Sequence, residues 1–312
     1  MAETETASTN PNLDQTLTYE GSGFRERALL WADAHLKWLL TLPAIAILFG
    51  LTFYPLLRAI EISTYQYLPA GRTFVGAANY INLLSNETFL HSLGVTAKFI
   101  GAAVGLEFLL GFAIALLLNR KIKLRGLWQT LILIPMILSP TVIGLIWRLM
   151  YAPNGLLDYL VQPLLGHNVG WISEPSVALI SVILTDVWQW TPLVTLVLFA
   201  GLQSVPNHIR EAAVMDGASR WQRFVTITLP YLKSLIVLVL IIRLVDALRV
   251  FAKVYILTRG GPGSSTNVIS MEMYRVAFRF SNFGQAAAMS LYLLVFVVIL
   301  ATVFVKVAGV EF

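Results

Sequence analysis

The chain has 312 residues, of which 57% are hydrophobic and only 12% are charged, and its mean hydropathy is +0.73. So few charges could not cover the surface of a soluble protein, whereas a lipid-facing surface does not need them, so the composition predicts a membrane protein. The absence of cysteine excludes disulfides, thiolate metal sites and cysteine nucleophiles. The net charge of +5 does not require a nucleic-acid partner, because a membrane protein concentrates Lys and Arg in its cytoplasmic loops. No nucleic-acid partner is expected.

The N-terminal part is polar and then becomes amphipathic. Residues 1–23 are rich in Thr, Ser, Asn and Glu and have neither the basic region nor the apolar core of a signal peptide, so we expect a disordered cytoplasmic tail. Residues 24–37 mix charged and apolar side chains, a pattern typical of an interfacial helix in the headgroup region. A plain helical extension of the first span is the alternative.

Six stretches are long and apolar enough to cross about 30 Å of hydrocarbon as helices. They lie near residues 38–58, 90–118, 127–150, 176–203, 229–257 and 285–308. We therefore expect an all-α membrane protein with a transmembrane domain over residues 38–308. Gly101 and Gly105 form a GxxxG pair, which predicts close approach of another backbone.

The positions of Lys and Arg orient these spans. With the N-terminus inside, twelve basic residues fall in cytoplasmic segments and five fall outside, which favours an N-in/C-in arrangement by the positive-inside rule. The inside set includes Arg120, Lys121, Lys123, Arg125, Arg210, Arg220, Arg223, Lys233 and Lys306. This orientation places the connection between the fourth and fifth spans in the cytoplasm.

That connection, residues 204–230, is too polar for the membrane and unlike a simple loop. We expect Asn207 to cap a helix that runs through Met215. Gly217 is expected to end this helix before a second helical piece begins near Ser219. The segment therefore predicts a compact helix–glycine–helix element on the cytoplasmic side.

The same segment resembles the EAA loop of bacterial ABC importer permeases. The residues that match at the family's spacing are Glu211, Ala212, Ala213, Asp216, Gly217, Ala218, Ile227, Leu229 and Pro230. Two further stretches, 187–192 and 255–266, resemble the carbohydrate branch related to maltose and glycerol-phosphate permeases. The resemblance covers about residues 40–308 and implies the six-helix fold of a type I ABC importer permease.

The resemblance implies that the EAA loop is a coupling helix that docks into a groove on a separate ATPase subunit. Glu211 would make a polar contact there, and the small side chains of Ala212 and Ala213 permit close approach. The implied partners are a second homologous permease subunit, two ATPase subunits, an extracytoplasmic substrate-binding protein and membrane lipid, in the bacterial cytoplasmic (inner) membrane. A solvated amphipathic loop is the alternative interpretation.

The sequence argues against an enzyme. It contains no GxxxxGK[ST] P-loop, so ATP and Mg are expected to be bound by the partner ATPase, and no cofactor is expected in this chain. Neither HExxH nor GxSxG occurs on a suitable element. The four histidines are scattered over different segments, so no metal site is expected.

Ionisable residues inside the spans mark the candidate substrate path, because a charge in the membrane is costly. Asp186 and Arg243 lie roughly 25 Å and 21 Å from the cytoplasmic ends of spans four and five, and therefore at similar depth. Helical spacing predicts two faces there, comprising Asp186, Gln189, Trp190 and Leu193 in span four and Arg243, Asp246, Ala247 and Val250 in span five.

Acids and amides beside a Trp suit a carbohydrate, whose hydroxyls form hydrogen bonds and whose C–H faces stack on the ring. The resemblance likewise implies substrate contacts from the helices that flank the EAA loop. In the structural alternative, Arg243, Asp246 and Arg249 neutralise one another along one helix and only hold the bundle together. Trp188 is expected to face lipid or to pack against another helix, and Glu107 is expected to be a packing residue.

Beyond the fifth span, Gly260, Gly261 and Pro262 predict a turn on the outer side. The resemblance implies that this outer loop reaches toward the binding protein and the substrate. A plain surface hairpin would have the same composition.

These observations predict the membrane-spanning permease subunit of an ATP-binding-cassette importer for a neutral sugar or polyol, working by alternating access. An anionic sugar or glycerol phosphate is an alternative cargo because Arg243 and Arg249 lie along the path. An ion-coupled secondary transporter, with Asp186 and Asp246 as carriers, is the alternative class, and it would leave the EAA loop unexplained.

Overall fold

The computed structural model describes residues 24–68 and 71–309, so the predicted tail, residues 1–23, lies outside the described residues. The chain divides into two compact units, residues 1–58 and 59–312. Helix α1 (Phe24–Ser63) is continuous, so no break separates the predicted interfacial segment 24–37 from the first span. Large apolar side chains of α1 are exposed, among them Leu40, Leu48 and Leu51.

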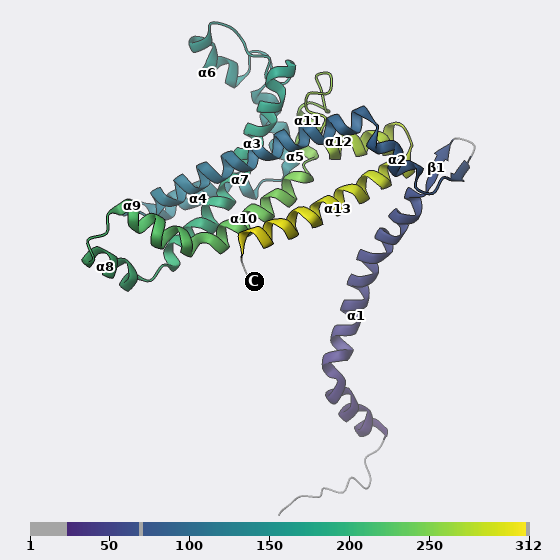
Figure 1. The fold of residues 1–312 in the computed structure, drawn as a ribbon, viewed down its shortest axis with the longest axis horizontal. Helices are drawn as coiled ribbons and strands as arrows, with labels where there is room; N and C mark the ends of the chain where they lie inside the picture. Colours follow the sequence, from purple (N-terminus) through teal and green to yellow (C-terminus); the bar gives the residue numbers. More distant parts are fainter. Residues whose placement is uncertain (1–23, 69–70, 310–312) are drawn as a thin grey trace, which may run out of the picture. The chain divides into compact units, whose positions relative to one another are not determined.

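The second unit is built on four long helices, α3 (Glu87–Leu118), α7 (Pro175–Ser204), α10 (Leu229–Leu248) and α13 (Phe283–Ala308). Helix α3 packs along α7, α10 contacts both, and α13 packs against α10 (Figure 1). Buried apolar side chains form one cluster between the first halves of α3 and α7 and the last turn of α10, and a second toward the ends of α3 and α7. A third cluster joins the start of α3 to α13.

Shorter elements lie before and between these long helices in the chain. Strands β1 (Tyr65–Leu68) and β2 (Gly71–Phe74) pair antiparallel, with Tyr65 opposite Phe74. The other short helices are α2 (Ala78–Leu84), α6 (Leu156–Leu165), α11 (Ala252–Leu257) and α12 (Ile269–Tyr274), which continues into a π-helical turn, Arg275–Arg279.

The all-α membrane fold predicted from the sequence is confirmed. Within the described residues, five helices are long and apolar enough to cross a membrane, and a bent pair of helices brings the number to six if it is one span. Elements α1, α3, α7 and α13 correspond to predicted spans one, two, four and six.

The third predicted span, 127–150, is not one straight helix. Helices α4 (Arg125–Ile137) and α5 (Pro140–Met150) meet at an angle of 96°. Pro140 has no N–H to continue α4, and it forces the preceding Ser139 into an extended conformation, with ψ of 147°. The Ser139 hydroxyl then accepts a hydrogen bond from Val142 N at 3.3 Å and caps the new helix.

The fifth predicted span, 229–257, is also wrong at its outer end. Helix α10 stops at Leu248, and the chain leaves the helical conformation at Phe251, with φ of −132°, before α11 begins. At its other end the apolar helix starts earlier, because α9 (Arg220–Arg223) and a π-helical turn, Phe224–Thr228, run directly into α10. The break before α11 decides which side chains reach the interior.

The close contact that needs a glycine lies further along α3 than the GxxxG pair. Gly101 and Gly105 are exposed, and a Cβ added at either would have no neighbour within 4 Å among the described residues. A Cβ at Gly111 would instead lie 2.7 Å from Val194 Cβ and 3.1 Å from Thr195 N. Gly111 therefore permits the crossing of α3 and α7.

We expect Gly111→Ala to destabilise the chain by about 1–3 kcal/mol, because the added methyl group forces α3 away from the backbone of α7. Thermal unfolding of the full-length chain in detergent measures this effect. Gly105→Ala is the matched control on the same helix, and it should be neutral or slightly stabilising because alanine favours a helix. Equal melting temperatures for the two variants would contradict the assignment of Gly111 to this contact.

Candidate functional site

A buried ion cluster lies where α3, α7, α10 and α11 meet. The side chains of Arg243 on α10 and Glu107 on α3 are only 1% and 0% exposed. Arg243 Nε donates to Glu107 Oε2 at 2.6 Å, and Nη2 donates to Oε1 at 3.0 Å. This bidentate pair links two long helices inside the bundle, where an unpaired charge would be strongly unfavourable.

Two more carboxylates complete the surroundings of Arg243. Its Nη2 also donates to Asp186 Oδ2 on α7 at 2.9 Å, and its Nη1 donates to Asp246 Oδ2 at 2.7 Å. The guanidinium carbon lies 4.8 Å from the centroid of the Trp190 ring. The single cation of Arg243 thus connects three helices and one face of an aromatic ring.

Lys253 on α11 is the second buried cation of the cluster. Its Nζ pairs with Asp186 Oδ1 and donates to Gln189 Oε1 at 2.8 Å. Gln189 Nε2 in turn donates to the carbonyl of Leu138 at 3.3 Å, in the break between α4 and α5. The break in the third span therefore has its freed carbonyl group satisfied by α7.

A cleft of about 260 Å³ opens beside the cluster. It is lined by Pro140, Asp186, Trp190, Asp246, Ala247, Arg249, Val250, Phe251, Ala252 and Lys253. The Asp246 side chain is 39% exposed, so that it is paired on one side and accessible on the other. The cleft thus combines aromatic faces with hydrogen-bonding groups.

The structure brings most of the predicted path residues together. Asp186, Trp190, Asp246, Ala247 and Val250 line the cleft. Gln189 and Arg243 lie behind the cleft in the ion cluster, whereas Leu193 packs into the apolar cluster toward the ends of α3 and α7.

The structural alternative, an ion ladder along one helix, describes only part of the contacts. Asp246 does pair with Arg243 and lies 3.9 Å from Arg249 Nη2. The remaining donors of Arg243 reach α3 and α7, so the interaction joins helices instead of running along one of them. Trp188 lies on the other side of α7, where its ring contacts Trp147 at 5.8 Å.

Sequence reasoning missed Lys253 and gave Glu107 no specific partner. Lys253 follows the break in the fifth span, so counting along an unbroken helix does not place it beside Asp186. Glu107 is 136 residues away from Arg243, and no local pattern connects them. The signal available in the sequence was the rarity of charged residues within spans.

The segment between α7 and α10 has the predicted helix–glycine–helix form, with one correction. Helix α8 (Asn207–Met215) begins at Asn207, so that Pro206 occupies the capping position and offers no side-chain cap. Pro206 also explains why α7 ends, because the preceding Val205 is extended. The predicted cap at Asn207 is therefore wrong by one residue.

The turn after α8 is held by backbone hydrogen bonds. Gly217 has φ of +73°, Gly217 N donates to Val214 O at 3.1 Å, and Ala218 N donates to Ala213 O at 3.0 Å. This is the Schellman pattern that ends many helices. Ser219 and Gln222 then form a reciprocal capping box at the start of α9, at 2.8 and 3.2 Å.

Helix α8 presents a mixed face to solvent. Glu211, Ala212 and Asp216 are exposed, while Ala213 is buried. Val214 and Met215 are 52% and 87% exposed, and neither is among the matched EAA residues. An exposed apolar pair beside a carboxylate favours contact with another protein.

The predicted outer turn is present after α11. Arg259, Gly260 and Gly263 all have positive φ, of 54°, 86° and 63°. Thr266 Oγ1 donates to the carbonyl of Gly261 at 2.8 Å and lies 2.7 Å from Thr258 Oγ1. Gly260, Gly261 and Pro262 therefore belong to a defined turn. Among the described residues, no group of acidic or histidine side chains could hold a metal ion.

The fold and the buried ion cluster define a helical membrane protein with a polar site among its spans. Residues 107–308 match the family described as binding-protein-dependent transport system inner membrane component, and the chain belongs to this family. It is therefore an inner-membrane permease subunit of a transport system that depends on a binding protein. Such a subunit is a transport component and not an enzyme.

Individual relatives agree with this assignment. The chain is 36% identical to the trehalose/maltose transport system permease protein MalF of Thermococcus litoralis, over 89% of this chain and 95% of the relative. It is 32% identical to the trehalose transport system permease protein SugA of Mycobacterium tuberculosis, over 89% and 90% of the two chains. The resemblance to ABC importer permeases is confirmed.

A solved structure supports the fold. The chain is similar to a chain of a bacterial ABC transporter involved in the import of the acidic polysaccharide alginate, with a TM-score of 0.78. The two chains are 22% identical, and the match covers 90% of this chain and 98% of the other. The type I permease fold predicted from the sequence is therefore confirmed.

Proposed function

We propose that this permease carries a neutral sugar or polyol and that the cleft beside the ion cluster is its substrate site. The main support for this proposal is the cleft itself, in which Trp190 and Phe251 offer ring faces and Asp246 offers a partly exposed carboxylate. Sugar C–H faces stack on aromatic rings, and sugar hydroxyls donate to carboxylates.

The charges around the cleft favour a neutral cargo over an anionic one. Two carboxylates, Asp186 and Asp246, and two cations, Arg249 and Lys253, line it, so that its formal charges cancel. Arg243 behind the cleft is balanced by Glu107. A cleft without excess positive charge gives a sugar phosphate little electrostatic advantage. The relatives named for trehalose and maltose transport also support a sugar.

We further propose that α8 is the coupling helix and that the importer contains a second permease subunit and two ATPase subunits. The EAA residues Glu211, Ala212, Ala213, Asp216, Gly217 and Ala218 would form the contact with the ATPase. Exposed Val214 and Met215 support this role because they add apolar area to a short helix. The outer turn, Gly260 to Pro262, would face the substrate-binding protein.

Sugar uptake into proteoliposomes that contain the complete importer tests this function. Uptake should require both the ATPase subunits and ATP, because the chain has no P-loop of its own. Omitting the ATPase subunits, with an imposed proton or sodium gradient, should leave only background uptake. Uptake driven by such a gradient alone would instead favour an ion-coupled secondary transporter.

Trp190→Leu should lower the uptake rate at saturating, substrate-loaded binding protein by roughly fivefold, because a stacking contact of about 1 kcal/mol is lost. Trp188→Leu is the matched control, since Trp188 lies two residues away on the same helix and does not line the cleft. Both variants should keep the wild-type elution volume. Equal rates for the two variants would exclude stacking on Trp190.

A further inference from the structure

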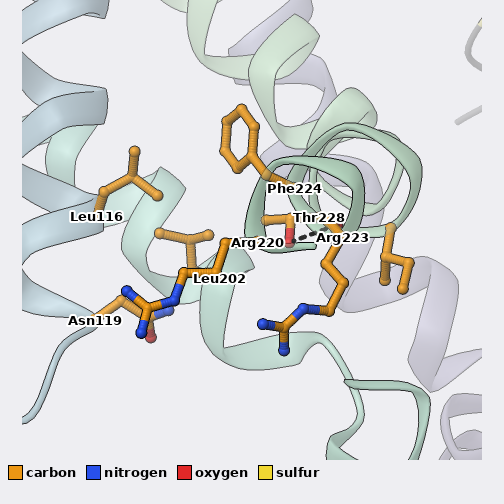
Figure 2. A pocket seen from close by; sticks show the side chains of 8 residues that line it. Leu116, Asn119, Leu202, Arg220, Arg223, Phe224 and Thr228 are labelled. Carbon is orange, nitrogen blue, oxygen red and sulfur yellow. Dashed lines mark hydrogen bonds between the residues drawn. The ribbon is translucent and has the colours of Figure 1, made fainter. Parts of the chain in front are cut away.

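The ends of α3 and α7 lie near α8, α9 and the start of the fifth span (Figure 1). Residues at these ends, on α9 and in the turn before α10 line a second cavity, of about 340 Å³. Its apolar wall consists of Leu116, Leu202, Phe224 and Ile227, and its polar groups come from Asn119, Arg220, Arg223 and Thr228 (Figure 2). None of these residues belongs to the sugar cleft or to α8, although five of them lie in the later part of the EAA loop, residues 204–230. Neither the sugar cleft nor the docking of α8 accounts for the cavity.

Arg220 and Arg223 dominate the polar side of this cavity. Arg220 and Arg223 lie one turn apart on α9, and both side chains reach into the space that Figure 2 shows. Within the described part of the chain, neither makes a salt bridge, and Arg223 Nε is buried without a hydrogen-bond partner. Two unneutralised guanidinium groups beside one cavity favour an anion, above all a phosphate.

The depth of the cavity points to the lipid headgroup region. Its walls are formed by the last turns of α3 and α7, by α9 and by the turn that precedes α10. Trp128 and Trp221, at 52% and 72% exposed, lie close in sequence to these ends, as expected for an interfacial aromatic belt. The adjoining connection from α3 to α4 adds the basic residues Arg120, Lys121, Lys123 and Arg125.

We propose that this cavity binds the headgroup of an anionic phospholipid from the cytoplasmic leaflet. Arg220 and Arg223 would pair with the phosphate, and Phe224 and Ile227 would pack against the glycerol and the upper acyl chains. Basic pockets between transmembrane helices on the cytoplasmic side suit anionic headgroups. The bound lipid would brace the junction between the EAA loop and the fifth span, so that coupling would depend on the lipid composition.

Native mass spectrometry of the full-length chain, titrated with phosphatidylglycerol, tests this proposal. The double variant Arg220→Gln/Arg223→Gln should bind the first lipid roughly thirtyfold more weakly, from the usual contribution of two basic residues at an anionic surface. Arg220→Lys/Arg223→Lys keeps the charge and should retain much of the affinity. Lys233→Gln/Lys306→Gln removes two predicted cytoplasmic cations that do not line the cavity, and it should bind like the wild type.

Three results would overturn the proposal. The first is equal affinity for phosphatidylcholine, in which the choline cation offsets the phosphate. The second is displacement of phosphatidylglycerol by excess inorganic phosphate, which would assign the cavity to a free anion. The third is unchanged lipid affinity in the glutamine double variant. If that variant also no longer co-purified with the ATPase subunit, the arginines would belong to the ATPase contact. Wild-type melting temperatures for all variants exclude misfolding as the cause of a loss.

Discussion

Replacing Glu107 by methionine is expected to destabilise the chain by about 3–5 kcal/mol. The carboxylate is fully buried and accepts two hydrogen bonds from Arg243. Its removal leaves Arg243, Lys253 and Arg249 facing only Asp186 and Asp246. Arg243 would keep Asp186 and Asp246, but its buried Nε would have no acceptor inside the membrane-spanning bundle.

A double variant separates the loss of one partner from the loss of the whole Glu107–Arg243 pair. In Glu107→Met/Arg243→Met both members are removed, and the remaining carboxylates still have partners, Asp186 with Lys253 and Asp246 with Arg249. Replacing a buried ion pair by apolar side chains is often neutral, whereas removing one partner is not. We therefore expect the double variant to be more stable than Glu107→Met alone.

Thermal unfolding of the full-length chain in one detergent measures both effects. Arg72→Met is the control for an exposed pair, because Arg72 lies 3.6 Å from Glu61 and its side chain is 52% exposed. Such surface pairs contribute roughly 0–1 kcal/mol. If Glu107→Met were no more harmful than Arg72→Met, the cluster would not hold α3, α7 and α10 together.

The sequence predicted what depends on local pattern. The apolar runs predicted the spans, and the polar residues between the fourth and fifth spans predicted a folded cytoplasmic element. Gly217 and Ser219 placed its turn correctly, because a helix end needs a residue that adopts positive φ and a helix start needs a side-chain acceptor. Such signals act over a few residues and can be read without the tertiary structure.

The ion cluster could be predicted only in part, because it depends on where two spans break. Asp186 and Arg243 were matched in depth by counting along straight helices, and they do meet, at 2.9 Å. Lys253 was missed because α10 stops at Leu248, so residues after the break no longer follow its periodicity. Breaks of this kind are stabilised by distant groups, as Gln189 stabilises the one at Leu138.

The structure also changes which variants test the sugar cleft. Asp186 and Arg243 belong to the predicted substrate path, but both are almost fully buried and paired. Alanine at either position would leave buried charges unpaired, and lost uptake would then report on stability. Trp190 tests the cleft better because it lines the cavity without carrying a charge.

Gly217→Val is expected to reduce ATP-driven uptake by at least about tenfold while membrane insertion stays normal. Gly217 has φ of +73°, in the left-handed region that a β-branched residue adopts only at a cost of about 1–3 kcal/mol. A Cβ at this position would meet no atom within 4 Å among the described residues, so the effect is one of backbone conformation and not of crowding. The substitution therefore acts on the turn alone.

Loss of that turn disturbs the link between α8 and α9. The hydrogen bonds from Gly217 N and Ala218 N fix the end of α8 and lead directly into the capping box of Ser219. Without them the exposed face of α8, with Glu211 and Met215, has no fixed direction relative to the fifth span. If α8 couples the permease to the ATPase, ATP hydrolysis can then no longer move the helices around the cleft.

Gly217→Asn provides the matched control, because asparagine tolerates positive φ far better than valine. Uptake into proteoliposomes and co-purification with the ATPase subunit should both be largely retained in Gly217→Asn and lost in Gly217→Val. Wild-type uptake and assembly in the valine variant would show that the turn has no part in coupling. Equal loss in both variants would show instead that the contact requires glycine itself, through close approach of the partner to a backbone without a side chain.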